Sequence, residues 1–155
     1  MRAAVIRCKM GARVMPNLAD PDAVLAAARL WVGTPYVLGA ALRGAGCDCV
    51  GLIRGVLADV AGGPVPDVPG WRVDWAQVAG RPLFEAAALH LAAALPEPRH
   101  GDVIAFRIAG REAHVGILAP RGRVIHAVER IGVVEVPLGA YADRIAFRVA
   151  FPAAR

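Results

Sequence analysis

The sequence predicts an α+β domain, with helices from the first half of the chain packed on one side of an antiparallel sheet from the second half. Before residue 100, apolar residues recur at the spacing of helices. After residue 100, short runs rich in Val, Ile and Phe alternate with turn signals such as Ala109-Gly110 and Arg121-Gly122. Short loops favour antiparallel hairpins, and helices followed by a strand meander form the α+β pattern.

The first helix is expected to begin at Pro21 and to end near Gly33. Asp20 is a good N-cap, and Pro21 suits the first helical position because its ring already holds a helical φ. Gly33 and the following Pro35 then stop the helix, since the residue before a proline avoids the helical conformation. Residues 1–17 show no periodicity and are read as an N-terminal arm or a short leading strand.

A glycine-rich loop at 33–47 leads into a second predicted helix. This helix should begin at Asp48 or Cys49 and end at the Gly62-Gly63-Pro64 run. Residues 63–81, which include Trp71 and Trp75, are expected to form a long loop.

The alanine-rich segment at 82–95 predicts a third helix, closed by Pro96 and Pro98. Strands are predicted after His100, where turn signals separate short β-rich runs. These runs lie at residues 101–108, 113–119, 123–129, 132–138 and 145–151.

Length and composition indicate one globular domain at 18–155, preceded by the arm at 1–17. The chain has 155 residues, of which 57% are hydrophobic and 20% charged, so it can bury a core without disulfide bonds. No apolar run reaches the roughly 18 residues of a membrane span. The basic N-terminus is not followed by an apolar stretch, so neither membrane insertion nor a signal peptide is expected.

The net charge is basic, at 18 − 13 = +5. A basic balance suits an anionic partner, such as nucleic acid, a cell wall or a carboxylate-rich substrate, although arginine can equally serve solubility. The arginines form no stripe and aromatic residues are few, so nucleic-acid binding is not predicted.

The chain has three cysteines, Cys8, Cys47 and Cys49, and an odd, small number argues against a disulfide framework. Cys49 is the candidate nucleophile, because backbone N–H groups and the helix dipole favour a thiolate at a helix start. The N–H groups of this first turn can also form an oxyanion hole. Gly51 is expected to keep side-chain bulk away from the thiol. Cys47 is either a packing residue or a second reactive thiol, and Cys8 has no partner in view.

A cysteine nucleophile needs a base and a group that orients the base. His114 and His126 occupy neighbouring β-rich runs, so a hairpin would place them side by side on one face. His114 is the predicted base and His126 the orienting residue. His90 and His100 are read as structural.

A zinc site made of Cys47, Cys49, His114 and His126 is a weaker alternative. Two cysteines separated by one residue point in opposite directions on a strand, and metal sites more often space them by two to four. We therefore expect no metal and no cofactor.

Four segments in series resemble the NlpC-type cell-wall peptidases, which are papain-like cysteine hydrolases of bacterial peptidoglycan. The segments are "GTPYVLGA…GCDCVGL" (33–52), "GDVIAF" (101–106), "HVGIL" (114–118) and "VIHA" (124–127), and the resemblance covers about residues 22–151. The cysteine pair in "GCDC", the short length and the loop with Trp71 and Trp75 look most like the branch found among phage tail genes and in gene transfer agents.

The resemblance implies the papain-like fold of this family and the roles of five residues. Cys49 holds the cysteine place of the family's Asp-Cys-Ser-Gly pattern, with His114 as base and His126 as the third polar residue. Tyr36 falls where the family has a tyrosine lining the site, and Asp48 where it has an aspartate that helps bind the substrate peptide. The usual substrate is the stem peptide of peptidoglycan, cut between D-γ-glutamate and a diamino acid.

One residue departs from the family pattern. Val50 stands where the pattern has a serine that helps to read the free amine of the peptide, so the peptide length accepted stays open. The predicted function is a peptidoglycan endopeptidase of a phage-like tail, made in the cytoplasm and acting on the wall of the target cell. The alternative is a structural tail or baseplate component with little or no activity.

Overall fold

The computed structural model describes residues 19–63, 93–94, 99–108 and 111–150. It contains two α-helices, α1 (Pro21–Arg29) and α2 (Cys49–Ala61), and a 3-10 helix, η1 (Gly139–Arg144). The strands are β1 (Ala41–Leu42), β2 (Gly46–Cys47), β3 (Ala93–Ala94), β4 (Val103–Ile108), β5 (Arg111–Ala119), β6 (Arg123–Val128), β7 (Gly132–Pro137) and β8 (Ile145–Ala150).

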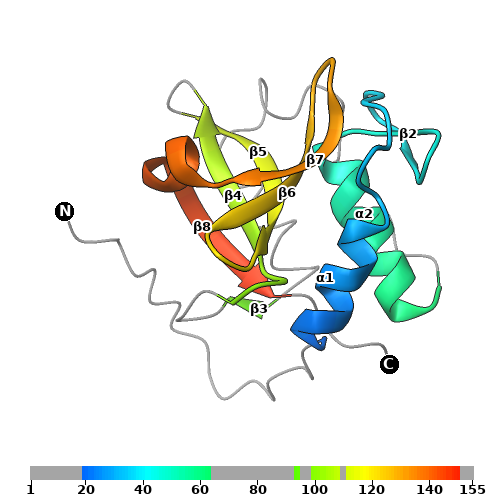
Figure 1. Cartoon of the computed structure of the whole chain (residues 1–155), viewed down its shortest axis with the longest axis horizontal. Helices are drawn as coiled ribbons and strands as arrows, with labels where there is room; N and C mark the ends of the chain where they lie inside the picture. Colours follow the sequence, from blue (N-terminus) through cyan, green and yellow to red (C-terminus); the bar gives the residue numbers. More distant parts are fainter. Residues whose placement is uncertain (1–18, 64–92, 95–98, 109–110, 151–155) are drawn as a thin grey trace.

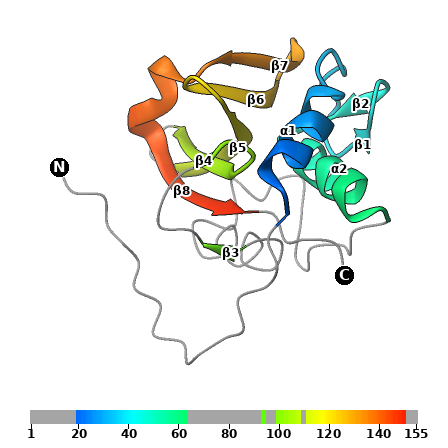
Figure 2. The ribbon, with the colours of Figure 1, turned by 60° about the horizontal axis from the view of Figure 1, so that its bottom comes forward.

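The main sheet has the strand order β3-β8-β4-β5-β6-β7, with every neighbouring pair antiparallel. Strands β4 to β7 form the predicted meander, and β8 returns to pair with β4 on its other side. Figures 1 and 2 show α1 and α2 side by side against one face of this sheet. The predicted α+β class, with helices packed on a central antiparallel sheet, is confirmed.

Both faces of the sheet are covered by apolar side chains. On the helix side, Leu52 and Val56 of α2 pack in one core with Ile117 and Ile125 of the sheet. The opposite face carries a smaller core of Ile104, Phe106 and Val124, against which Tyr141 of η1 packs. Because side chains alternate along a strand, the same strands supply both cores.

Both predicted helix starts are confirmed. The Asp20 side chain accepts a hydrogen bond from the Asp22 N–H, which caps α1. Helix α1 ends at Arg29, earlier than the predicted Gly33, because the next N–H groups form tighter i→i−3 bonds, such as Trp31 to Ala28. Gly62 ends α2 in the left-handed conformation, with φ of 71°.

The predicted third helix at 82–95 is wrong at its end. Ala93–Ala94 is strand β3, which pairs antiparallel with Val149 and Ala150 of β8. Helix propensity of alanine is a weak preference that pairing with an open sheet edge overrides. The rest of that segment, the predicted loop with Trp71 and Trp75, and the arm at 1–17 lie outside the described residues.

The glycine-rich loop at 33–47 contains a small hairpin, β1 with β2, that the sequence did not predict. None of the described helices has both the length and the apolar character that crossing a membrane requires.

Candidate active site

Helix α2 begins at Cys49, and Asp48 fixes this helix start to the preceding loop. One oxygen of the Asp48 carboxylate accepts hydrogen bonds from the N–H groups of Val50 (3.1 Å) and Gly51 (2.7 Å). The other oxygen accepts from the N–H of Gly39, at 2.7 Å. Asp48 is only 5% exposed, so its carboxylate serves the helix cap and the loop. The predicted role of Asp48 in substrate binding stays a prediction.

Gly51 is required for a different reason from the one predicted. A Cβ at this position would overlap the carbonyl oxygen of Ala40, and the Ala40 carbonyl carbon would lie only 2.9 Å away. The missing side chain therefore lets the loop pass directly over the first turn of α2. This close approach supports the Gly39 contact to Asp48 and so the position of Cys49.

The Cys49 thiol is surrounded by backbone donors. Backbone groups of Val115, Val50 and Cys49 itself lie close to the thiol and favour the thiolate. Burial, followed by the nearby Asp48 charge, nevertheless raises the pKa of Cys49 to about 12. The helix-start argument predicted a lowered pKa, but desolvation outweighs it, so the resting thiol carries its proton.

His114 on β5 and His126 on β6 are in direct contact, as the hairpin prediction required. His114 Nε2 lies 2.8 Å from His126 Nδ1, and the ring centroids are 5.0 Å apart. This hydrogen bond engages Nε2 of His114 and leaves its Nδ1 for another partner. If Nδ1 is to accept the thiol proton, Nε2–H must be the donor to His126, so His126 accepts at Nδ1.

Gly116 makes room for this pair of histidines. A Cβ on Gly116 would lie 2.7 Å from Cγ2 of Val124 and 3.1 Å from Cβ of His126. Because residues two apart on a strand share a face, Gly116 lies beside His114 on the face that carries both imidazoles. The glycine of the "HVGIL" segment thus has a steric role next to the base.

Two aromatic residues that the sequence analysis did not identify enclose the histidines. The Phe106 ring stacks on His114 at 5.9 Å and 28°, and Tyr141 meets the His126 ring edge-on at 5.7 Å. Phe106 and Tyr141 are themselves 5.6 Å apart. Phe106 pairs with His114 across β4 and β5, so strand register could have revealed it. Tyr141 comes from η1, which no pattern in the sequence predicted.

This enclosure keeps both imidazoles neutral at neutral pH. Burial, with the neighbouring His126 as a second cause, lowers the pKa of His114 to about 4. Burial also lowers the pKa of His126, which is 2% exposed. The resting site therefore combines a protonated thiol with a neutral imidazole, which suits a base that takes the proton during the reaction.

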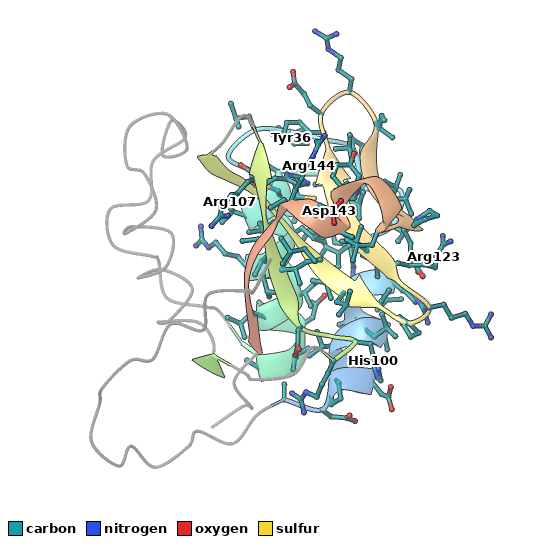
Figure 3. All side chains as sticks on the ribbon, turned by 90° about the vertical axis from the view of Figure 1, so that its left-hand side faces the viewer. Tyr36, His100, Arg107, Arg123, Asp143 and Arg144 are labelled. Atoms are coloured by element: carbon teal, nitrogen blue, oxygen red, sulfur yellow. The ribbon has the colours of Figure 1, made fainter. Side chains whose placement is uncertain are left out.

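Tyr36 lies beside the start of α2, where the family resemblance implied a site-lining tyrosine. Its backbone forms a parallel bridge with Cys47. Burial, and then the charges of Cys49 and Asp48, raise the pKa of the Tyr36 phenol. Figure 3 shows Tyr36 at the opposite end of the molecule from His100.

The structure therefore places four of the predicted site residues near one another. His114 contacts His126, and the Cys49 thiol reaches the main chain of Val115, one residue after His114. Tyr36 lies near Cys49. These positions suit a nucleophile, a base and an orienting group, whose roles stay predictions.

The other candidate residues have structural positions. Cys47 is fully buried in β2, and burial raises the pKa of its thiol to about 11. His100 bonds to Asp22 at 2.7 Å and ties the loop before β4 to α1, as predicted for a structural histidine. Within the described ranges, no group of three or more His, Cys, Asp or Glu residues is placed to hold a metal ion. Cys8 and His90 lie outside the described residues.

Protonation of the histidine pair is expected to destabilise the fold below about pH 6.5. The folded pKa of His114, about 4, lies below the ordinary value of 6.5, so the unfolded chain binds more protons in between. The free energy of unfolding should therefore fall as the pH decreases through this window. Urea unfolding at about pH 7 and about pH 5 measures the change. His114→Gln should show a smaller loss, and an equal loss in both proteins would contradict this origin.

Comparison with known proteins points to one family. Residues 33–146 match the model of the NlpC/P60 family. A search of curated proteins finds no match. Among solved structures, the NlpC/P60 domain of peptidoglycan hydrolase SagA is 28% identical, with a TM-score of 0.57, and the match covers 84% of this chain and 97% of that domain.

Two further structures are longer than the part they share with this chain. A lipoprotein-like NLP/P60 family protein from Staphylococcus aureus is 26% identical, with a TM-score of 0.57, and the match covers 93% of this chain and 45% of that protein. An NlpC/P60 family protein from Bacillus cereus is 20% identical, with a TM-score of 0.61 and coverage of 86% and 41%, and supports the fold alone.

Proposed function

Because this chain belongs to the NlpC/P60 family of peptidoglycan hydrolases, which are cysteine peptidases, we propose that it cleaves peptidoglycan stem peptides through a thioester at Cys49. The observation that carries the proposal is the placement of Cys49 at the start of α2. Its thiol there lies near the main chain of Val115, the residue directly after His114, and His114 in turn bonds to His126.

The proposed reaction begins when Nδ1 of His114 takes the thiol proton and the Cys49 sulfur attacks the scissile carbonyl. Backbone N–H groups at the start of α2 stabilise the negative oxygen of the tetrahedral intermediate. His114 then returns the proton to the leaving amine, and the carbon–nitrogen bond breaks to leave the thioester. Water, deprotonated by His114, hydrolyses the thioester and restores the thiol. His126 accepts the Nε2–H bond throughout and holds the imidazolium that forms.

For the bond itself, we propose the link between D-γ-glutamate and a diamino acid. The support is the resemblance of the "GCDCVGL", "HVGIL" and "VIHA" segments to the NlpC-type peptidases. Val50 replaces the serine that reads a free amine in that pattern. Recognition of a free N-terminal amine is therefore not part of the proposal.

We further propose that a phage-like tail or gene transfer agent carries the enzyme to the target wall. The cysteine pair in "GCDC" and the segment with Trp71 and Trp75 support this context, because they resemble the tail-encoded branch. Mass spectrometry of purified particles from the producing cell tests the proposal. Recovery of the chain with tail proteins supports it, and recovery only in the particle-free fraction contradicts it.

The proposed bond is tested by mass spectrometry of fragments released from diaminopimelate-type peptidoglycan. We expect one new amine on diaminopimelate and one new γ-carboxyl on D-glutamate, and no cleavage of the glycan strand. The Cys49→Ala protein, prepared identically, controls for contaminating hydrolases. Fragments that end at any other bond would contradict the assignment.

A further inference from the structure

A positively charged pocket lies apart from the residues of the proposed active site. It has a volume of about 570 Å³ and opens between the end of α1 and the β5–β6 and β6–β7 strand pairs. Its lining residues are Arg29, Pro120, Arg121, Arg123, Glu135 and Pro137. Three guanidinium groups face one carboxylate, so the lining has a net charge of 3 − 1 = +2.

The single carboxylate in this pocket is already shared by two arginines. Glu135 accepts from Nε and Nη2 of Arg29, at 3.0 and 3.2 Å, and from Nε of Arg123 at 3.2 Å. Nη2 of Arg123 also bonds to the Glu135 carbonyl oxygen, at 2.6 Å. These bonds hold two guanidinium groups in place and leave part of their N–H donors unused, because each guanidinium has five.

The third arginine is presented by a rigid turn. Arg121 has a φ of 60° and Gly122 a φ of 64°, and the Gly122 carbonyl accepts a 2.7 Å hydrogen bond from the Leu138 N–H. Arg121 is exposed, and no ion pair in the described part of the chain engages it. The turn therefore brings an unneutralised guanidinium to the mouth of the pocket.

We propose that this pocket binds carboxylate or phosphate groups of the polymeric cell wall and acts as an anchor separate from the catalytic site. Fixed guanidinium groups match the geometry of carboxylates and phosphates. Because Glu135 already holds the Arg29 and Arg123 side chains in place, a ligand need not order them. Three of the arginines that make the chain basic are gathered in this pocket. The identity of the ligand as wall polymer rests on the proposed function.

None of the residues that line the pocket belongs to the proposed active site. Arg123 and His126 are three positions apart on β6, so their side chains point to opposite faces of the sheet. A wall polymer held at Arg123 therefore does not contact the histidine pair. Binding at two places raises the effective concentration of the enzyme at its insoluble substrate.

Sedimentation with purified wall sacculi tests the anchor, with all proteins carrying Cys49→Ala so that the polymer stays intact. We expect Arg121→Gln to weaken binding on the order of tenfold, because one charge-assisted contact is lost. Arg130→Gln is the matched control, since Arg130 is also an exposed turn arginine with positive φ, at 66°, in the β6–β7 turn. Equal binding of the two variants would overturn the proposal.

Two treatments of the sacculi distinguish the sources of the anion. Hydrofluoric acid removes phosphodiester polymers, and carbodiimide amidation neutralises carboxylates. If the difference in binding between Arg121→Gln and Arg130→Gln disappears after one treatment, the group which that treatment removes or neutralises is the ligand. Persistence of the difference after both treatments would overturn the anionic ligand. Thermal unfolding confirms that the variants are folded. None of these experiments measures hydrolysis, so failure of the anchor can be told apart from failure of the proposed enzymatic reaction.

Discussion

Cys49→Ala is expected to abolish the release of stem-peptide fragments, whereas Cys47→Ala should keep substantial activity. Removing the nucleophile of a cysteine hydrolase lowers the rate by at least about 10³-fold, because no other group can form the thioester. Cys49 lies at the start of α2, and its thiol is near the main chain of Val115, the residue after His114. Cys47 is fully buried within β2 and faces the helix-side core.

The two substitutions should also differ in their effect on stability. Cys47→Ala removes a buried sulfur, so we expect it to lower the free energy of unfolding by about 1–2 kcal/mol. Cys49 is only half-buried, so Cys49→Ala should change the free energy of unfolding less. Fragment release from purified peptidoglycan and urea unfolding of the same preparations give both quantities. Full activity in the Cys49 variant would refute the assignment of the nucleophile.

Gly51→Ala is expected to damage both stability and activity, against the trend of helix propensity. Alanine is favoured over glycine inside a helix by about 1 kcal/mol. Here, however, the new Cβ would overlap the Ala40 carbonyl, which is backbone and cannot rotate away. Either the loop or the first turn of α2 must move, and such overpacking costs about 2–3 kcal/mol.

The expected loss of activity follows from the same displacement. Moving the first turn of α2 away from the loop shifts Cys49 relative to Val115 and weakens the Asp48 bonds to Val50 and Gly51. Gly139→Ala is the control, because a Cβ there meets nothing within 4 Å and stability should change by no more than about 0.5 kcal/mol. If Gly51→Ala is as stable and active as Gly139→Ala, the close approach does not govern this site.

Much of the secondary structure was predictable because its signals are local. Asp20 and Asp48 are helix caps within a few residues of the N–H groups they bind, and alternating apolar residues marked the five long strands. The pairing of Ala93–Ala94 with β8 was not predictable, since it joins residues more than fifty positions apart. The local alanine content favoured a helix there, and only pairing with the edge of the sheet makes this segment a strand.

For the candidate site, too, the local signals were predictable and the long-range ones were not. The sequence by itself determined which residues are candidates, because Cys49 follows a helix cap and His114 and His126 belong to adjacent strands. The tertiary structure decided their chemical state. Phe106, from the paired strand β4, and Tyr141, from η1, desolvate the histidines, and burial likewise raises the Cys49 pKa despite its place at a helix start.

The physical reason is the range of the forces involved. Capping bonds and strand alternation act over a few residues, so they can be predicted from neighbouring positions in the sequence. Desolvation depends on everything packed around a group, so the neutral His114 and protonated Cys49 arise only when the helices, the sheet and η1 have come together.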